Sequence, residues 1–225
     1  MGLPARLEKL QLVAGRFDVG ADVACDHAYL SRSLLKTNQA NYMIATDVAK
    51  KPLIVAKKTL RYFPDRSEVR LGYGLRPLKD NEADVIFISG LGAETIVEIL
   101  EDGIDRFDKA DFLLQVNGDP TELRRFLLDK PIYKEEMVKE RDRYYQIVAI
   151  KKGYPEGKEL WSIKDKRYQN AVFRLGTLSA TDLGHEYMRK RLRDIDKALI
   201  QLRKDDPRGD ELRIEAAYYR KKLGG

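Results

Sequence analysis

The residue types best suited to chemistry lie in one short segment, Asp22-Val23-Ala24-Cys25-Asp26-His27-Ala28-Tyr29-Leu30. Two carboxylates and several small residues lie there between an apolar, strand-like run and a helical pattern. Such a segment can bind a small molecule by close backbone approach and through its carboxylates. Asp47 ends a second strand-like run 25 residues after Asp22, where an acid can accept hydrogen bonds from ribose hydroxyls. Together these features predict a site for an adenosine-containing cofactor.

The turn after the first predicted strand contains no glycine. Dinucleotide-binding folds usually place G-x-G-x-x-G there, so that a pyrophosphate can approach a helix N-terminus. Ala24, Cys25 and Asp26 occupy this turn, which argues against NAD or FAD. S-adenosylmethionine carries no phosphate, and carboxylates and backbone groups can bind its charged groups. A second loop, Ser89-Gly90-Leu91-Gly92-Ala93, has glycines that would let a cofactor or substrate approach the backbone.

The elements that must position these loops are predicted from alternating strand-like and helical patterns. Strands are expected at 20–25, 42–46, 67–71, 84–89, 111–116 and 144–151, with a weaker one at 132–139. Helices are expected at 5–14, 28–37, 51–63, 93–102 and 120–129. This alternation predicts an α/β fold with a mainly parallel, doubly wound sheet and helices on both faces.

The last third of the chain has a different character. Residues 152–182 show few clear elements and are interpreted as a linker. Apolar residues then recur at 4-3-4-3 spacing, at Met188, Leu192, Ile195, Leu199 and Leu202. After a turn at 205–209, in which Pro207 is expected to stop the first helix, the spacing resumes at Leu212, Ala216, Tyr219 and Leu223. We therefore predict one domain over 1–152 and, within 153–225, a basic linker and a small antiparallel helical hairpin with coiled-coil-like seams.

Composition limits the class of protein. No run of about 18 apolar residues occurs, which argues against a membrane span. The start, 1–8, lacks the apolar stretch of a signal peptide. A single cysteine excludes an intramolecular disulfide and a multi-cysteine zinc site, and no other metal-ligand spacing is present. We expect a cytoplasmic protein without a metal, and its oligomeric state stays open.

The positive charge is concentrated at the C-terminal end. Residues 1–150 carry 23 Lys and Arg against 24 Asp and Glu, whereas residues 151–225 carry 19 against 12. A localised basic surface attracts a phosphate backbone through neutralisation and counterion release. A solvated basic helix face would give the same composition. Charge therefore favours a nucleic-acid partner without deciding it.

Several segments, in order across residues 5–150, resemble the TrmK family of bacterial tRNA (adenine-22-N1)-methyltransferases. The most specific is Asp26-His27-Ala28-Tyr29-Leu30 together with Gly90-Leu91-Gly92. Weaker matches are Asp47-Val48 with Pro52-Leu53, 69–75, 83–84, 114–117 and Tyr144-Tyr145. The chain differs from the family pattern at Ala24 and Lys51, where glycine is usual, and at Tyr73, where an acid or polar residue is usual. The resemblance implies a Rossmann-like class I methyltransferase domain followed by a coiled-coil-like helical domain.

The resemblance also implies an activity, methylation of adenine N1 at position 22 of the tRNA D-arm by in-line displacement from S-adenosylmethionine. Adenine N1 has an in-plane lone pair, so a strong general base is not obligatory, and alignment is the main task. The implied catalytic residues are Asp26, His27, Tyr29 and Asn117. The implied cofactor-binding residues are Asp22, Ala24, Cys25, Asp26, Asp47, Val48, Gly72, Tyr73, Gly74, Ser89, Gly90, Leu91 and Gly92. The implied tRNA-binding residues are Arg143, Tyr145, Arg189, Arg193 and Lys197.

Structural alternatives stay open for these residues. Asp26 could cap the helix near Ala28, Asp47 could cap the next helix, and Tyr29 could pack in the core. His27 could be a structural histidine, and Asn117 could merely complete a turn. At the level of the whole protein, two alternatives are a catalytically silent RNA-binding protein on the same fold and a small-molecule methyltransferase.

Overall fold

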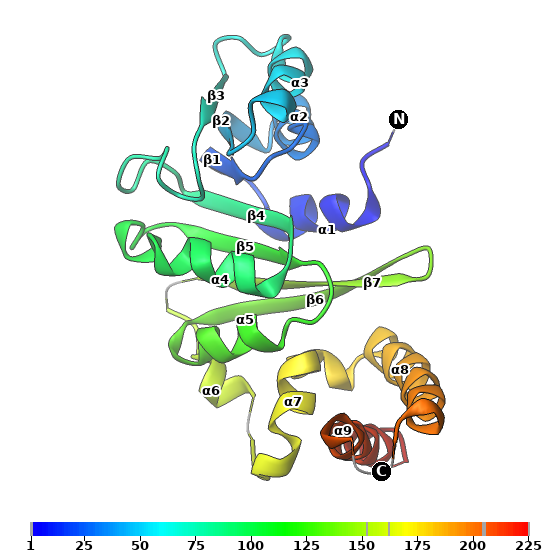
Figure 1. The fold of residues 1–225 in the computed structure, drawn as a ribbon. Helices are drawn as coiled ribbons and strands as arrows, with labels where there is room; N and C mark the ends of the chain where they lie inside the picture. The colour runs from blue at the N-terminus through cyan, green and yellow to red at the C-terminus, as the bar shows by residue number, and fades with distance from the viewer. Residues whose placement is uncertain (1, 152, 162, 204–205, 225) are drawn as a thin grey trace.

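The structure, a computed structural model that describes residues 2–151, 153–161, 163–203 and 206–224, is built on a mixed β-sheet (Figure 1). In these residues the sheet has seven strands: β1 (Phe17–Val23), β2 (Ala40–Asp47), β3 (Ser67–Leu71), β4 (Val85–Leu91), β5 (Asp111–Val116), β6 (Ile132–Glu140) and β7 (Arg143–Ile150). Their spatial order is β3-β2-β1-β4-β5-β7-β6. Strands β1 to β5 pair in parallel, whereas β7 is antiparallel to β5 and β6. The predicted mainly parallel sheet is confirmed.

All the predicted strands are present, and β1 shows how their ends differ from the prediction. Phe17 already pairs with Ala40, three residues before the predicted start, because the ladder with β2 extends beyond the apolar run. At the other end, Ala24 has a left-handed φ of 55°, which a β-strand cannot accommodate. The strand therefore ends at Val23 rather than at Cys25.

Helices cover both faces of the sheet, as predicted. One face is covered by α1 (Ala5–Ala14), α2 (Tyr29–Lys36) and α3 (Lys50–Leu60). The opposite face is covered by α4 (Ala93–Glu101) and α5 (Thr121–Phe126). A 3-10 turn, Leu127–Asp129, follows α5, so the helix predicted at 120–129 tightens in its last turn. The doubly wound arrangement follows from strands that are apolar on both sides.

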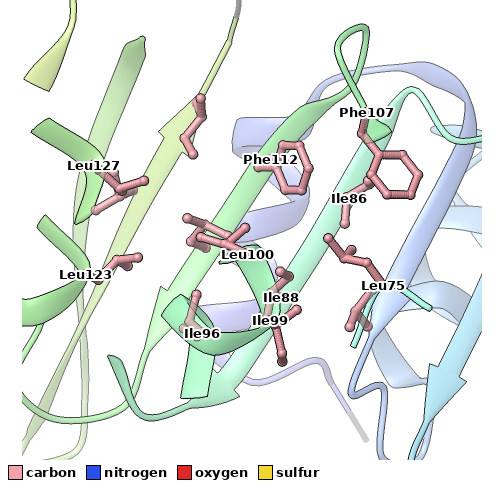
Figure 2. Packing of buried hydrophobic residues seen from close by; sticks show 14 of the residues in the cluster. Leu75, Ile86, Ile88, Ile96, Ile99, Leu100, Phe107, Phe112, Leu123 and Leu127 are labelled. Carbon is pink, nitrogen blue, oxygen red and sulfur yellow. The ribbon is translucent and has the colours of Figure 1, made fainter. Parts of the chain in front are cut away.

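The larger core lies between α4 and the central strands. Ile96, Ile99 and Leu100 share one face of α4, since residues three and four apart lie together on a helix. Figure 2 shows them beside Ile86 and Ile88 of β4, and all five side chains are almost fully buried. Each such burial contributes about 1.5–3 kcal/mol. This packing holds α4, and with it the glycine-bearing loop before it, against the sheet.

The prediction that residues 152–182 form a linker with few elements is wrong for the described part of this segment; Lys152 and Ser162 lie outside the described residues. The segment forms α6 (Gly157–Leu160), a 3-10 turn η3 (Lys166–Tyr168), α7 (Gln169–Leu175) and a second 3-10 turn η4 (Gly176–Ala180). Trp161 and Phe173 are buried in the same core as α4. The elements are too short to show a helical period in the sequence, which explains the error.

A buried ion pair attaches this segment to the sheet domain. The Arg124 and Glu135 side chains lie 2.6 Å apart and are almost completely buried. Arg124 also donates a 2.8 Å hydrogen bond to the Phe173 carbonyl, and Glu135 accepts a 2.9 Å hydrogen bond from the Trp161 indole. Burial alone would raise the pKa of Glu135, but the Arg124 charge and the hydrogen bonds to Glu135 keep its pKa below the usual range. The carboxylate is therefore ionised, and Arg124 of α5, Trp161 and Thr177 of η4 hold it.

The two predicted C-terminal helices are confirmed as α8 (Asp182–Gln201) and α9 (Pro207–Gly224), which pack against each other. The Thr181 hydroxyl caps α8 by accepting a 3.0 Å hydrogen bond from Gly184 N. Pro207 begins α9 instead of ending α8, a first-turn position in which its missing N–H has no cost. Asp205, part of the predicted turn, lies outside the described residues. No helix in the described ranges is long and apolar enough to cross a membrane.

Candidate active site

The loops with the predicted cofactor-binding residues lie along one edge of the sheet, where β3, β2, β1 and β4 end in that order. Next along the edge come the end of β5 and, because β7 is antiparallel, the start of β7. These segments are 72–74, 47–48, 24–28, 89–92 and 117–118. The predicted loop 89–93 begins inside the sheet, because β4 continues to Leu91 instead of ending at 89. Open α/β sheets bind ligands at this edge. The fold therefore gathers all the predicted cofactor-binding residues, with Asp22 just inside β1.

The loop after β1 has an unusual backbone. Ala24, Asp26 and Ala28 have φ values of 55°, 50° and 54°, a region that residues other than glycine adopt rarely. Such strain persists only where surrounding contacts impose it, and it is concentrated at functional sites. Cys25 is buried between these residues, and burial raises the pKa of its thiol. Cys25 is therefore a packing residue and not a thiolate nucleophile.

Asp47 holds this loop from the neighbouring strand. Its Oδ2 accepts a 3.1 Å hydrogen bond from Asp26 N, and its Oδ1 accepts a 2.9 Å hydrogen bond from Ala49 N, beside the exposed Val48. A carboxylate offers about four lone-pair sites, so acceptor capacity remains for ligand hydroxyls. Asp47 can therefore make the predicted contact with a ribose and, at the same time, the contact with the start of α3 that was its structural alternative.

Asp22 has a different environment, because its side chain points into the protein. Its Oδ2 accepts hydrogen bonds from the hydroxyl (2.7 Å) and the backbone N–H (3.3 Å) of Ser31. Burial raises the pKa of Asp22 to about 7, although the Ser31 hydrogen bonds lower it in part. Asp22 therefore ties β1 to α2 beneath the loop.

The site is acidic. The carboxylates of Asp22, Asp26 and Asp47 come from two adjacent strand ends, and the Asp47 charge contributes to the raised pKa of Asp22. Among the described residues, no group of three His, Cys, Asp or Glu side chains is arranged to hold a metal ion. A negative site of this kind favours a ligand that carries positive charge.

The loop after β3 reaches the same edge. Gly72 N donates a 3.0 Å hydrogen bond to the Asp47 carbonyl, and a Cβ at Gly72 would collide with the Pro77 ring. The Tyr73 hydroxyl donates a 3.3 Å hydrogen bond to Glu98 of α4, and the Arg76 guanidinium lies 5.5 Å from the Tyr73 ring centroid. Tyr73 therefore braces this loop against α4.

The glycine-bearing segment 89–92, at the end of β4, is held by two side chains of the β5 region. Gly90, at a φ of 80°, donates a 3.1 Å hydrogen bond from its N–H to Gln115 Oε1. The Gln115 amide donates to Asn117 Oδ1 at 3.1 Å, and Asn117 Nδ2 donates to the Gly90 carbonyl at 2.6 Å. The Leu91 carbonyl accepts from Asn117 N at 2.7 Å. Both ends of the Asn117 amide are thus engaged in fixing the loop.

Asp26, His27 and Tyr29 form an exposed cluster beside this edge. His27 Nδ1 lies 2.6 Å from Asp26 Oδ2, and the His27 and Tyr29 rings stack at 5.6 Å with an interplanar angle of 9°. Tyr29 is 45% exposed, so the alternative of core packing is wrong. Asp26 does not cap α2, because Ala28 is the N-cap and the Asp26 carboxylate contacts His27 instead of an N–H of the helix. The three side chains are available to a ligand.

The predicted RNA-binding residues lie at the far end of the edge and on α8. Arg143 and Tyr145, at the start of β7, line a groove with Asn117. Arg189, Arg193 and Lys197 are exposed on α8, and no ion pair joins them to another described residue. The other wall of the groove is formed by different residues of α8, Tyr187, Lys190, Arg191 and Asp194.

The sequence profile of the family described as "Methyltransferase domain" matches residues 3–148, more than half of the chain. The chain belongs to this methyltransferase family. The matched range contains all seven strands of the described sheet except the last two residues of β7. It also includes every loop of the acidic edge.

Known proteins resemble this methyltransferase more specifically. It is 31% identical over 154 residues to the tRNA (adenine(22)-N(1))-methyltransferase of Bacillus subtilis, a match that covers 65% of each chain and so less than two thirds of that relative. The crystal structure of the B. subtilis m1A22 tRNA methyltransferase TrmK has a TM-score of 0.85 at 22% identity, covering 99% of both chains. Streptococcus pneumoniae Sp1610, a putative tRNA (m1A22) methyltransferase in complex with S-adenosyl-L-methionine, has a TM-score of 0.83 at 23% identity, covering 99% and 100%. The predicted resemblance and fold are confirmed, and the structural likeness includes α6 to α9.

Some site residues of the methyltransferase were missed from the sequence. Gln115 is fully buried and fixes Gly90, and the only signal was a polar residue within the apolar run 112–116. Ser31, the partner of Asp22, was the one polar residue on the buried face of α2. A buried polar side chain needs hydrogen-bond partners, so such interruptions can indicate a structural link.

A polar network also links the methyltransferase edge to the C-terminal helices. Arg174 of α7 pairs with Asp119, two residues after Asn117, at 2.5 Å and with Glu215 of α9 at 2.8 Å. Arg191 of α8 pairs with Glu215 at 2.9 Å. These residues are far apart in the chain, and no sequence pattern indicated that they meet.

Proposed function

We propose that this methyltransferase transfers the methyl group of S-adenosylmethionine to N1 of adenine 22 in the D-arm of tRNA. Support comes from the activity named for the B. subtilis relative and from the neighbour with bound S-adenosylmethionine. The observation in the structure that carries the proposal is the convergence of Asp47, the loop 24–28 and the glycine-bearing loop 89–92 at one sheet edge. A tRNA substrate would place this activity in the cytoplasm.

The residues of the edge fit S-adenosylmethionine. Its sulfonium and amino groups are cationic, which suits a site with Asp26 and Asp47. Its ribose hydroxyls can donate to the remaining lone pairs of Asp47. Gly90 and Gly92 have no neighbouring atom within 4 Å of a Cβ position, so space is open beside their backbone. Asp47, the loop 24–28, Gly72–Gly74 and the loop 89–92 would hold the cofactor.

The reaction needs alignment more than proton transfer. The cofactor supplies an electrophilic methyl carbon on sulfur, so transfer forms the N1–carbon bond and breaks the carbon–sulfur bond. Adenine N1 uses its own lone pair and becomes cationic once methylated. Asp26 would stabilise that positive charge, and its 2.6 Å contact with His27 would orient the imidazole.

Tyr29 and His27 supply the surface for the target base. Their parallel rings form a stack on the surface, with the Arg32 guanidinium 5.7 Å from the Tyr29 ring centroid, and a base that has left the RNA stack can bind there. We assign Asn117 to positioning, because both ends of its amide already bind Gln115 and Gly90. Arg189, Arg193 and Lys197 would meet the tRNA backbone on α8.

Two measurements test the proposal. Calorimetric titration with S-adenosylmethionine should show binding that Asp47→Asn weakens and Asp65→Asn does not, since Asp65 is an exposed acid in the loop that precedes β3, away from the active-site edge. Mass spectrometry of incubated tRNA should find N1-methyladenine, which a tRNA with guanine at position 22 should lack. No cofactor binding would instead favour a silent RNA-binding protein. Cofactor binding without tRNA methylation would favour a small-molecule methyltransferase.

A further inference from the structure

A groove of about 470 Å³ lies between the start of β7 and α8. One wall is formed by Asn117 and the β7 residues Tyr144 and Tyr145, and the other by Tyr187 and Lys190 of α8. Its volume is within the range of roughly 300–1,000 Å³ that is usual for small-molecule sites. The groove is therefore large enough for one nucleobase with its sugar.

The groove continues the line of active-site loops. Asn117 binds the Gly90 carbonyl in the glycine-bearing loop and also lines the groove. Strand β7 is two positions along the sheet from β4, and neighbouring strands lie about 4.8 Å apart, so the two sites are about 10 Å apart. This spacing is on the scale of neighbouring nucleotides in an RNA strand whose stack has opened.

The walls of the groove are suited to an aromatic ligand. The Tyr144 and Tyr187 rings meet edge to face at 5.4 Å and 84°. Tyr145 also lines the groove and is partly exposed, with the Arg6 guanidinium 5.4 Å from its ring centroid. The Tyr187 hydroxyl makes no hydrogen bond with any described residue, and burial raises its pKa to about 12, so it stays a neutral donor. Stacking on tyrosine is a common way for proteins to bind a base that has left its helix.

The charges of the groove favour a base over a phosphate. Arg191, the third cation of the lining, is paired with Glu215 at 2.9 Å. Arg143 and Lys190 are opposed by Asp142 and Asp194, whose carboxylates form no ion pair with a described residue. Lys190 also donates a 2.6 Å hydrogen bond to the Asp142 carbonyl, which occupies one of its donors. Two free carboxylates would repel a phosphate but can accept hydrogen bonds from an exocyclic amino group.

We propose that this groove binds the base of a nucleotide next to the methylated adenine in the same tRNA strand, stacked on tyrosine and with its amino group toward Asp142 and Asp194. The inference rests on the proposed function for the identity of the strand. It adds a second base-binding site that determines which neighbours of the target adenine are accepted.

The first test uses tRNA in which 2-aminopurine replaces either neighbour of the target adenine, titrated without cofactor. We expect one position to change fluorescence on binding, and Tyr145→Ala to abolish that change. Because loss of base stacking weakens binding by about 1–3 kcal/mol, Tyr145→Ala should lower the affinity about 5- to 100-fold. Tyr145→Phe should stay within about twofold. The control Tyr62→Ala alters a 70% exposed tyrosine two residues after the end of α3 and should leave the fluorescence change and the affinity unaltered.

A second pair of variants, both at exposed positions, tests whether the groove binds a base or a phosphate. Asp194→Lys in the groove should lower the affinity, because it removes an acceptor for the amino group. Asp210→Lys makes the same charge change at an exposed position of α9. It should raise the affinity for tRNA, because the added lysine attracts the RNA phosphates. If Asp194→Lys raises the affinity as much as Asp210→Lys, or Tyr145→Ala binds like the wild type, the inference is overturned. These readouts need no methyl transfer, so they remain decisive even if tRNA is not methylated.

Discussion

The side-chain amide of Asn117, after β5, donates a 2.6 Å hydrogen bond to the carbonyl oxygen of Gly90, near the end of β4. Gln115 closes the ring by binding both residues. The conformation of a loop that faces the cofactor site is therefore set from the next strand along the sheet. The same Asn117 lines the groove beside β7, so one residue borders both proposed sites.

Replacing Asn117 should loosen the glycine-bearing loop. Asn117→Ala leaves Gly90 O and Gln115 Nε2 without these partners, which corresponds to about 1–3 kcal/mol and a 5- to 100-fold loss of cofactor affinity. Calorimetric titration with S-adenosylmethionine measures the effect. Asn41→Ala, which removes an exposed hydrogen bond to Asp18 at the start of β2, is the control. Equal affinity in both variants would show that Asn117 does not position the loop.

Ala24 should be a site of stored backbone strain. At its φ of 55°, glycine has no Cβ penalty, so Ala24→Gly should leave stability unchanged or raise it by up to about 1 kcal/mol. In α9, Ala217→Gly should lower the free energy of unfolding by about 1 kcal/mol, because glycine is unfavourable inside a helix. Urea denaturation compares the two. A loss of similar size at both positions would contradict the strain assigned to Ala24.

Asp22 should make stability depend on pH. Its folded-state pKa of about 7 exceeds the ordinary value of 3.8, so the folded state binds more protons between these values. Asp22 therefore contributes fully to the free energy of unfolding below about pH 4, and this contribution is lost as the pH rises through 7.

The substitution Asp22→Asn removes this titration while keeping an acceptor for Ser31. The free energy of unfolding of Asp22→Asn minus that of the wild type should rise by about 2–3 kcal/mol from pH 5 to pH 8, as measured by urea denaturation. The exposed Asp65→Asn should show no such trend. A constant difference between Asp22→Asn and the wild type at both pH values would rule out the raised pKa.

Two adjacent arginines should differ sharply in their effect on stability. Arg124→Met leaves the buried Glu135 carboxylate unpaired and should cost about 3–5 kcal/mol. Arg125→Met breaks an exposed pair with Glu122 and should cost less than about 1 kcal/mol. Thermal or urea denaturation separates these cases. A small effect of Arg124→Met would mean that the ion pair does not hold the segment 157–180 to the sheet domain.

Reversing the exposed cations of α8 should weaken tRNA binding without changing cofactor affinity. For the triple change Arg189→Glu, Arg193→Glu and Lys197→Glu, each lost phosphate contact removes about 0.9 from the slope of log affinity against log salt concentration, or about 2–3 in total. Binding titrations at several salt concentrations give this slope. Reversal of the exposed Lys57 and Lys58 on α3 is the control. An unchanged slope in the triple variant would mean that α8 does not bind the RNA backbone.

The sequence by itself determined the succession of strands and helices through residue 150 and the place of Asp47 and the loop 24–28 at strand ends. These features depend on side-chain periodicity and turn residues, which act between near neighbours in the chain. The same local logic failed at residues 157–180, where the helices are too short to show a period and are stabilised by contacts with Arg124 and Glu135.

Only the tertiary structure decided how these parts meet. The insertion of β7 between β5 and β6 brings Arg143 and Tyr145 to the active-site edge. The bonds that define the site join residues distant in the chain, such as Gly90 with Asn117, 27 positions apart, and Arg174 with Glu215, 41 apart. Such pairings follow from the packing of the whole chain, because their energy is gained only after the sheet and the helices have closed the intervening loops.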